Sequence, residues 1–366
     1  MRTAFCYNAN DSKVFFTVDG GEYVCHRPAN PNRVAGNSLN VINLNGGVFS
    51  AWNLARAQAD ASYTGKPEAY VNFNGGTYRA IKDYPLFGTK GGGAWANAVD
   101  RVTVFEKGAT IDVPQNLTGV SVDVPMDKPS GKGVSYIPWD DTTTEFVGAP
   151  FVDIVKDEGA SGWGATAMAV YDPDTRHVTA IRITSPGCGY ETGRVRAHIV
   201  YPGSRTWTNE VTLAESATTG SFTKKGAGML VLNVANTYGG DTVIEDGTLH
   251  VMAEGAIPEG SSIVMKGGTL SAAGVTLPAM NFKFVLGETF ASAGSIVFPE
   301  GSTITVDNLA SLDPEAREYV LATYEKGVTG TAEFLQEADL PSGWKFRIGA
   351  KKIKISRSRG TLAILR

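Results

Sequence analysis

Aromatic and acidic side chains lie close together near the middle of the sequence. Tyr136, Trp139, Asp140 and Asp141 occupy one short segment. An aromatic face stacks on a pyranose ring, and a carboxylate accepts hydrogen bonds from sugar hydroxyl groups. We therefore predict that these four residues line a saccharide-binding patch. As a lectin-like site, it would centre on Tyr136, Trp139 and Trp163.

Asp140 and Asp141 are less suited to catalysis than to binding. Adjacent residues of a strand point to opposite faces, which counts against both acids serving one reaction. Hydrolysis of a glycosidic bond requires two carboxyl groups roughly 5–10 Å apart, a separation that the sequence does not fix. We assign no catalytic residue and expect a protein that is not an enzyme. A β-helical polysaccharide lyase or glycoside hydrolase is the alternative.

The sequence gives little support for a metal site or for a catalytic nucleophile. The four histidines are isolated from one another and from any Ser or Cys elbow, so neither a zinc site nor a catalytic triad is predicted. Asp172 and Asp174 lack the Asp-x-Asp-x-Asp-Gly loop that calcium needs, and Asp172-Pro173-Asp174 is typical of a hairpin turn. We expect no cofactor and no metal.

The amino-acid composition narrows the class of protein further. Charged residues make up 19% of the chain, and the formal net charge is −4, which gives no attraction to nucleic acid. No apolar stretch is long enough for a membrane-spanning helix, and no signal peptide is visible. Cys6, Cys25 and Cys188 have no metal-ligand spacing, so we expect free or buried thiols, although Cys6 and Cys25 would pair if neighbouring strands brought them together.

Glycines mark a recurring unit of strand, tight corner and strand. It appears at Gly46-Gly47, Gly75-Gly76 and Gly267-Gly268, each followed by a short β-rich run. Successive units are spaced by about twenty to thirty residues, the range expected of stacked solenoid coils. A single coil cannot bury its inward side chains, so coils must stack on one another. For residues 1–125, ordinary hairpins with Gly-Gly turns are the alternative.

Other segments depart from this pattern. Residues 145–200 contain three alternating runs and predict a small antiparallel module. Ala51–Ala61 is Ala-rich and predicts a short helix, and Asp313–Tyr319 predicts one or two helical turns. Lys352-Ile353-Lys354-Ile355-Ser356 predicts a terminal strand with a basic face suited to an exposed edge. Attachment of this basic tail to an acidic polymer is the functional alternative.

Residues 221–251 carry the most specific motif. Lys225-Gly226-Ala227-Gly228 is followed by Leu230 and Leu232, then by Asn236-Thr237-Tyr238, and finally by Gly247-Thr248-Leu249. This order resembles the autotransporter-associated β-strand repeat. The resemblance implies a right-handed parallel β-helix in a large exported protein of a bacterial surface, where the repeat serves as a stalk and aids export. No C-terminal series of membrane-barrel strands is evident, so we expect another secretion route or a truncated gene.

Residues 145–191 resemble a β module bounded by Gly and Tyr that recurs in bacterial surface and phage structural proteins. The segments that carry the resemblance are Gly162-Trp163-Gly164 and Pro186-Gly187-Cys188-Gly189-Tyr190. This resemblance again implies a structural role.

Together these patterns predict an all-β protein built as a right-handed parallel β-helix with an inserted antiparallel module. Residues 1–135 are expected to form β-rich coils, 136–214 the module, and 215–366 the β-helix with the repeat. The expected role is a secreted or cell-surface stalk, scaffold or adhesin, with a cell-surface or extracellular polysaccharide as its partner.

Overall fold

Strands dominate the chain. The computed structural model describes residues 3–6, 12–26, 29–32, 37–57, 67–88, 96–201, 203, 205–272, 275, 277, 279–287, 289–292, 295–325 and 327–358. Within these ranges, the helical elements are the short 3-10 turns Leu309–Ser311 and Glu337–Asp339. The prediction of an all-β protein is confirmed, and much of the pairing between strands is parallel.

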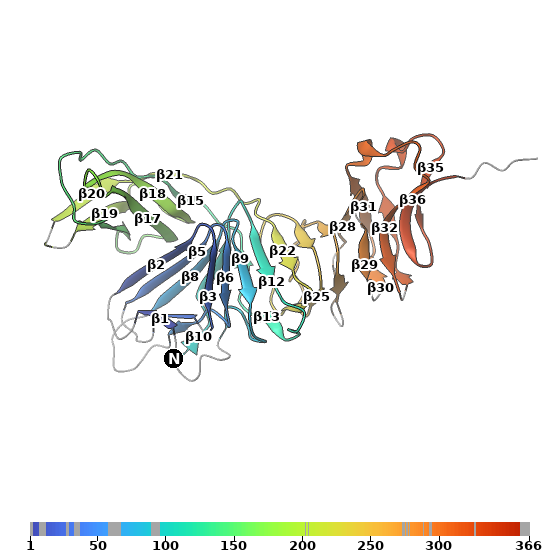
Figure 1. Cartoon of the computed structure of the whole chain (residues 1–366), viewed down its shortest axis with the longest axis horizontal. Helices are drawn as coiled ribbons and strands as arrows, with labels where there is room; N and C mark the ends of the chain where they lie inside the picture. Colours follow the sequence, from blue (N-terminus) through green and yellow to red (C-terminus); the bar gives the residue numbers. More distant parts are fainter. Residues whose placement is uncertain are drawn as a thin grey trace, which may run out of the picture.

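Each unit in the first part of the chain contributes one strand to each of two parallel sheets (Figure 1). In chain order these strand pairs are β2 (Lys13–Val18) with β3 (Glu22–Cys25), β5 (Leu39–Leu44) with β6 (Val48–Ala51), β8 (Glu68–Phe73) with β9 (Thr77–Ala80), and β11 (Arg101–Val104) with β12 (Ala109–Asp112). The first members pair as β2-β5-β8-β11, which we call the outer sheet, and the second members pair as β3-β6-β9-β12. Strands joined by a Gly-Gly corner therefore pair with the next unit and not with each other, so the hairpin alternative is wrong.

The corners need glycine because successive corners stack closely. Gly47 has φ +62°, and a Cβ atom there would lie 2.4 Å from the backbone oxygen of Gly21 in the preceding corner. Gly247 has φ +67°, and its Cβ would lie 2.3 Å from the oxygen of Gly228. Any side chain at these positions would clash with backbone, which explains why glycine recurs at each corner.

The second sheet continues past the inserted segment without a break. β12 pairs directly with β22 (Phe222–Lys225), although more than a hundred residues separate them in the sequence. The sheet then runs through β24 (Thr242–Ile244), β26 (Ile263–Met265), β28 (Asn281–Val285), β31 (Ser302–Asp307) and β34 (Ala332–Phe334), which makes ten strands; we call it the long sheet. A further parallel sheet contains β13 (Val120–Val122), β23 (Met229–Leu232), β25 (Thr248–Val251) and β27 (Thr269–Ser271).

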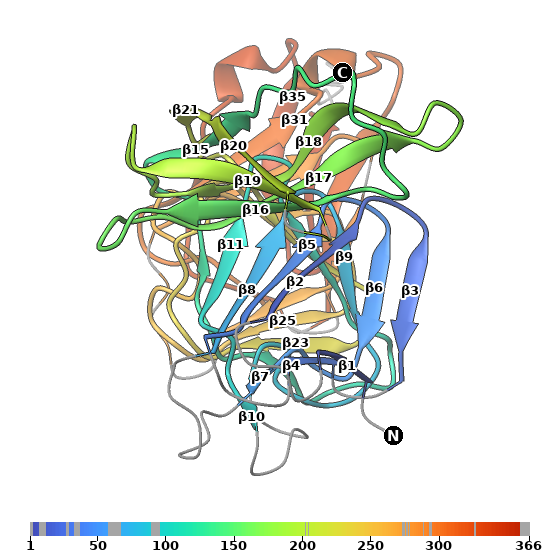
Figure 2. The same ribbon diagram turned by 90° about the vertical axis from the view of Figure 1, so that its left-hand side faces the viewer.

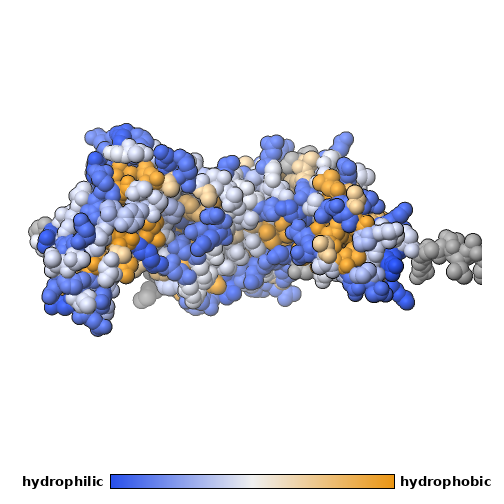
Figure 3. Space-filling view, turned by 90° about the horizontal axis from the view of Figure 1, so that it is seen from above, coloured by the Kyte–Doolittle hydropathy of each residue, from blue (hydrophilic) through white to orange (hydrophobic). Residues whose placement is uncertain are grey.

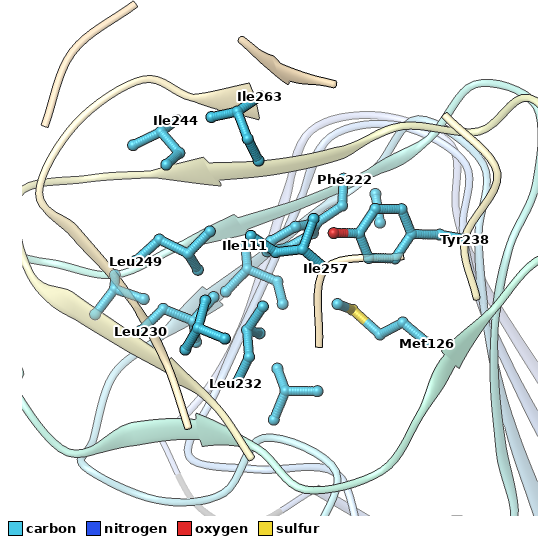
Figure 4. Packing of buried hydrophobic residues seen from close by; sticks show 14 of the residues in the cluster. Ile111, Met126, Phe222, Leu230, Leu232, Tyr238, Ile244, Leu249, Ile257 and Ile263 are labelled. Atoms are coloured by element: carbon cyan, nitrogen blue, oxygen red, sulfur yellow. The ribbon is translucent and has the colours of Figure 1, made fainter. Parts of the chain in front are cut away.

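Inward side chains of the long sheet form a continuous ladder. In register these positions are Tyr23, Phe49, Tyr78, Ile111, Lys224, Ile244, Met265, Phe284 and Val306. Figure 4 shows Ile111 and Ile244 of this ladder together with Leu230 and Leu249, around a common interior. Each fully buried aliphatic or aromatic side chain contributes about 1.5–3 kcal/mol. Lys224 is the one charged residue of the ladder.

The segment between β14 (Met126–Asp127), which also pairs with β11, and β22 folds as an antiparallel module. It contains β15 (Lys132–Tyr136), β16 (Phe151–Lys156), β17 (Trp163–Asp172), β18 (His177–Cys188), β19 (Val195–Tyr201), β20 (Arg205–Glu210) and β21 (Thr212–Glu215). Asp172 Oδ1 accepts the backbone N–H of Asp174 at 2.9 Å, which confirms the predicted turn between β17 and β18. Small and aliphatic side chains, such as Ala167, Ala197 and Ile199, give the module its own buried cluster.

The last part of the chain adds a mixed sheet. β29 (Phe290–Ser292) pairs in parallel with β32 (Glu318–Tyr324), while β36 (Lys352–Arg357) lies between β32 and β35 (Trp344–Ile348) in antiparallel pairing. The predicted terminal strand is confirmed, but it is an inner strand and not an edge. Three short pairs complete the structure: β1 (Thr3–Cys6) with β4 (Ala29–Asn32), β7 (Arg56–Ala57) with β10 (Ala96–Asn97), and β30 (Ser295–Val297) with β33 (Gly327–Thr329).

Both predicted helices are wrong where the structure describes them. Ala51 ends β6, and Arg56–Ala57 forms the strand β7, because Leu54 donates its N–H to Leu86 O and β7 pairs with β10; residues 58–61 lie outside the described ranges. Asp313 caps only a single turn, with Ala316 N–H donating to Asp313 O at 3.1 Å. From Glu318 onward, pairing with β29 and β36 holds the backbone extended. In both cases hydrogen bonds to distant segments outweigh the local helix signal.

Candidate functional site

The predicted saccharide-binding residues separate into two places. Trp139 donates its indole N–H to Val178 O at 2.9 Å, close to the turn between β17 and β18. Trp163 pairs with Cys188 at the opposite end of the same hairpin. Trp163 and Tyr171, the register partner of Val178, are eight residues apart along β17, a span of about 26 Å in an extended strand. Trp163 therefore does not share a site with Trp139.

Asp141 organises the loop that follows it. Its Oδ1 accepts the backbone N–H groups of Thr143 and Thr144, each at 2.9 Å, and its Oδ2 accepts the Thr144 hydroxyl at 2.7 Å and the Trp207 indole N–H at 3.1 Å. These hydrogen bonds, the Thr144 hydroxyl foremost, hold the pKa of Asp141 well below its usual range. Its carboxylate is thus largely occupied by its own loop, while Asp140 is exposed.

The neighbouring aromatic rings pack on one another. Trp139 is half-buried, with its ring centroid 5.6 Å from that of Trp207 and 6.3 Å from that of Phe146. Tyr136 at the end of β15 is 58% exposed. Of this group, Tyr136 and Asp140 thus have the most accessible surface, and a saccharide-binding role for the patch stays a prediction.

The antiparallel module lies across the outer sheet, as Figure 2 shows. Thr17, Asn43 and Asn72 face it in register, one from each of β2, β5 and β8. Asn43 Nδ2 donates to Thr166 Oγ1 at 2.7 Å, and Asn72 Nδ2 lies 3.0 Å from Gly164 O. The outer sheet is therefore covered on both faces, by its apolar interior on one side and by β17 and β18 on the other.

Ion pairs and one ring contact fix the rim of this interface. Lys13 of β2 pairs with Asp153 of β16 at 2.6 Å, and Arg182 of β18 pairs with Asp19 at 2.8 Å. Between these pairs, Phe15 stacks on Phe151 with ring centroids 5.2 Å apart. Contacts of three kinds hold the module against the outer sheet.

A pocket of about 340 Å³ opens where the module meets the outer sheet. Glu68 and Tyr70 from β8, with Asp100 and Arg101 at the start of β11, form one wall. The other wall comes from the module and contains Lys156, Ser161, Gly162 and Trp163. We call this the junction pocket.

The two acidic residues of the junction pocket differ in their partners. Asp100 Oδ2 lies 3.1 Å from Arg56 Nε and accepts the N–H of Ala69 at 2.8 Å. Burial first, and then the negative charge of Glu68, raise the pKa of Tyr70, whose hydroxyl is hydrogen-bonded to Glu68. The phenol therefore stays protonated at neutral pH.

Two cations face the same space. The Arg101 guanidinium lies 4.1 Å from the centroid of the Trp163 ring, and within the described residues it forms no ion pair. Lys156 Nζ donates to the backbone oxygen of Gly162 at 3.0 Å. The Trp163 indole N–H is buried and has no acceptor among the described residues.

Sequence reasoning found Trp163 but missed the residues opposite it. Tyr70 and Arg101 are register partners in β8 and β11, yet β9 and β10 lie between these two strands in the sequence. Aligning the corner glycines Gly75 and Gly108 places Tyr70 beside Thr103, two residues from its true partner. No sequence signal places this pair next to Trp163.

The described residues contain neither a metal-binding cluster nor a membrane-spanning helix. No group of three or more His, Cys, Asp or Glu side chains within the described ranges is arranged to hold a metal ion. The same residues contain no helix with the length and apolar character needed to cross a membrane. Cys188 is a buried free thiol, and burial raises its pKa.

Two polar residues of the motif at 221–251 have structural roles. Lys224 is fully buried, and its ammonium donates to the backbone oxygens of Lys225, Gly226 and Asp246 at 2.9, 2.5 and 2.9 Å. Asn236 Oδ1 accepts the N–H of Met126 at 2.9 Å, and its Nδ2 donates to Ala256 O at 2.6 Å. These polar side chains therefore join one layer of the stack to its neighbours.

Comparison with known proteins finds a match in this part of the chain. Residues 222–251 match the family model of the passenger-associated-transport-repeat. No curated protein and no solved structure matches the chain. This match confirms that residues 222–251 resemble the autotransporter-associated repeat, as the sequence predicts.

Proposed function

We propose that the chain is a non-enzymatic stalk or adhesin segment of an exported surface protein. In this proposal the outer sheet, the long sheet and the β13-β23-β25-β27 sheet are the faces of a right-handed parallel β-helix. Residues 1–135 and 215–366 would build this helix, and 136–214 would form the module that it displays.

One observation carries the proposal. The ten-stranded long sheet runs without interruption from β3 to β34, and the matched repeat supplies two consecutive layers of it, β22 and β24. The molecule is correspondingly elongated, as Figures 1 and 3 show, and Figure 1 shows the module at the side of one end. A long, regular stack that carries a laterally attached module suits a spacer that presents a surface away from its anchor.

The use of the acidic residues favours a structural role over catalysis. Asp141 shapes its loop, Asp153 and Asp19 tie the module to the outer sheet, and Glu318 pairs with Lys352 and Lys354 at 2.6 and 2.5 Å. Hydrogen bonds lower the pKa values of Asp141 and Glu318, whereas an acid catalyst needs a proton near neutral pH.

Surface exposure tests the proposal directly. Cells that make the protein would be treated, while intact, with a membrane-impermeant amine reagent, and we expect the chain to be labelled. Ile244→Asp places a charge in the buried ladder and should reduce the labelled amount, whereas Glu245→Gln on the outside of the same layer should not. A chain that is labelled only after the cells are broken would contradict the proposal.

A further inference from the structure

The junction pocket carries an excess of available positive charge. Its acids are Glu68 and Asp100, and its bases are Arg101 and Lys156. Asp100 is already paired with Arg56 and hydrogen-bonded by Ala69 N–H. Glu68 is then left opposite two cations, and a ligand that brings one negative charge would balance the pocket.

Arg101 is placed to bind a planar anion. The Trp163 ring orients its guanidinium from one side, and its N–H donors have no carboxylate partner within the described residues. A guanidinium presents a rigid fork of donors that matches the two oxygens of a carboxylate. Lys156 shares one donor with Gly162 O and keeps the others for a ligand.

The remaining lining suits hydroxyl groups. The exposed Glu68 carboxylate and the Ser161 hydroxyl offer acceptors, and the Trp163 indole N–H is a buried donor without an acceptor. A buried donor that lacks a partner is costly unless a ligand or water completes it. The pocket volume of about 340 Å³ lies at the small end of the range of roughly 300–1,000 Å³ for small-molecule sites.

We propose that the junction pocket binds a carboxylated saccharide unit, a uronic acid residue of an acidic polysaccharide. Its carboxylate lies on Arg101 and Lys156, its hydroxyl groups bond to Glu68 and Ser161, and the Trp163 ring forms part of the wall. The walls come from both the outer sheet and the module, so a bound uronate also bridges the two. The site goes beyond the stalk role, which does not depend on it.

A matched pair of arginine variants tests the site. Arg101 and Arg205 both stack on a tryptophan, with guanidinium-to-centroid distances of 4.1 and 4.6 Å, but only Arg101 lines the pocket. Titration calorimetry of the full chain with oligogalacturonate would be compared for the unchanged protein, Arg101→Met and Arg205→Met. We expect Arg101→Met to weaken binding about tenfold or more, because a charge-assisted pair is lost, and Arg205→Met to bind as before.

Two further probes distinguish the ligand chemistry. The methyl ester of the same oligosaccharide lacks the negative charge and should bind at least about tenfold more weakly, and added salt should weaken the binding of the acid form. Absence of oligogalacturonate binding, equal losses in both variants, or tighter binding of an acidic peptide than of the saccharide would overturn the proposal. None of these results would alter the surface labelling expected of the stalk.

Discussion

Lys224 donates a hydrogen bond to the backbone oxygen of Asp246 at 2.9 Å, and this bond joins β22 to the corner before β25. The same ammonium satisfies the oxygens of Lys225 and Gly226. One buried lysine thus supplies the donors for two stacked corners, which accounts for a charged residue in an otherwise uncharged ladder.

Replacing this lysine should destabilise the stack. Lys224→Met keeps the length of the side chain but removes the donor of Gly226 O and Asp246 O and one of the two donors of Lys225 O, which keeps the N–H of Val113. We therefore expect the free energy of unfolding to fall by about 3 kcal/mol. Lys225→Met is the matched control, because Lys225 is exposed on the same strand. Urea unfolding followed by circular dichroism measures both, and equal stability of the two variants would remove this role from Lys224.

The protonation of Lys224 predicts a pH dependence. Burial lowers its pKa to about 8, against about 10.4 in an unfolded chain. Between these values the unfolded chain binds more protons, so the stability that Lys224 contributes increases as the pH rises from about 8 to about 10. The difference in urea midpoint between the unchanged protein and Lys224→Met should widen over that range. A constant or narrowing difference would show that the folded pKa is not lowered.

The interface between the module and the outer sheet depends on Asn72. Its amide nitrogen lies 3.0 Å from both Gly164 O and Ser185 Oγ. Asn72→Ala should therefore loosen the module, with a loss of about 2 kcal/mol in local stability. Hydrogen exchange of β17 and β18 measures this opening.

Asn233→Ala is the control for Asn72→Ala. Asn233 makes an exposed hydrogen bond to Asp123 at 2.6 Å, away from the module. Exchange in β17 and β18 should match the unchanged protein in this variant. If exchange were unaffected in Asn72→Ala as well, the other contacts, such as Asn43 with Thr166 and the rim ion pairs, would hold the interface without Asn72.

The sequence predicted those features that are repeated and local. Gly47 and Gly247 mark corners because close stacking of backbone excludes any side chain there. Alternating runs identified the strands, and the hairpin turn at Asp172 follows from its own short motif. Aligning Gly46-Gly47 with Gly75-Gly76 places Phe49 beside Tyr78, which is their true register. The same alignment fails between β8 and β11, because the next unit differs in the distance from strand to corner.

The sequence does not predict the junction pocket, for a different reason. Arg101 and Trp163 belong to separate sheets, and their contact depends on how the module is docked. Docking rests on single polar contacts such as Asn43 to Thr166, which no periodicity reveals. The aromatic and acidic residues around Asp141 predict a sugar ligand, but threonines two and three positions later are a signal for a side-chain-capped turn, which the structure shows.

Asp140 and Asp141 form a final matched pair that separates loop structure from ligand binding. Asp141→Asn removes the charge that accepts from Thr143, Thr144 and Trp207, so we expect the module to lose about 1–3 kcal/mol of stability. Asp140 is exposed, and Asp140→Asn should leave stability unchanged.

The same pair of variants predicts a pH dependence. Because the pKa of Asp141 is held below its usual range, the stability that Asp141 contributes is complete above about pH 4 and is lost as the pH falls further. Thermal unfolding at neutral pH and at about pH 3 measures both effects. If Asp140→Asn weakened saccharide binding without changing stability, the exposed end of the module would contain a second sugar-binding surface, whereas an effect confined to Asp141 and to stability would make this region purely structural.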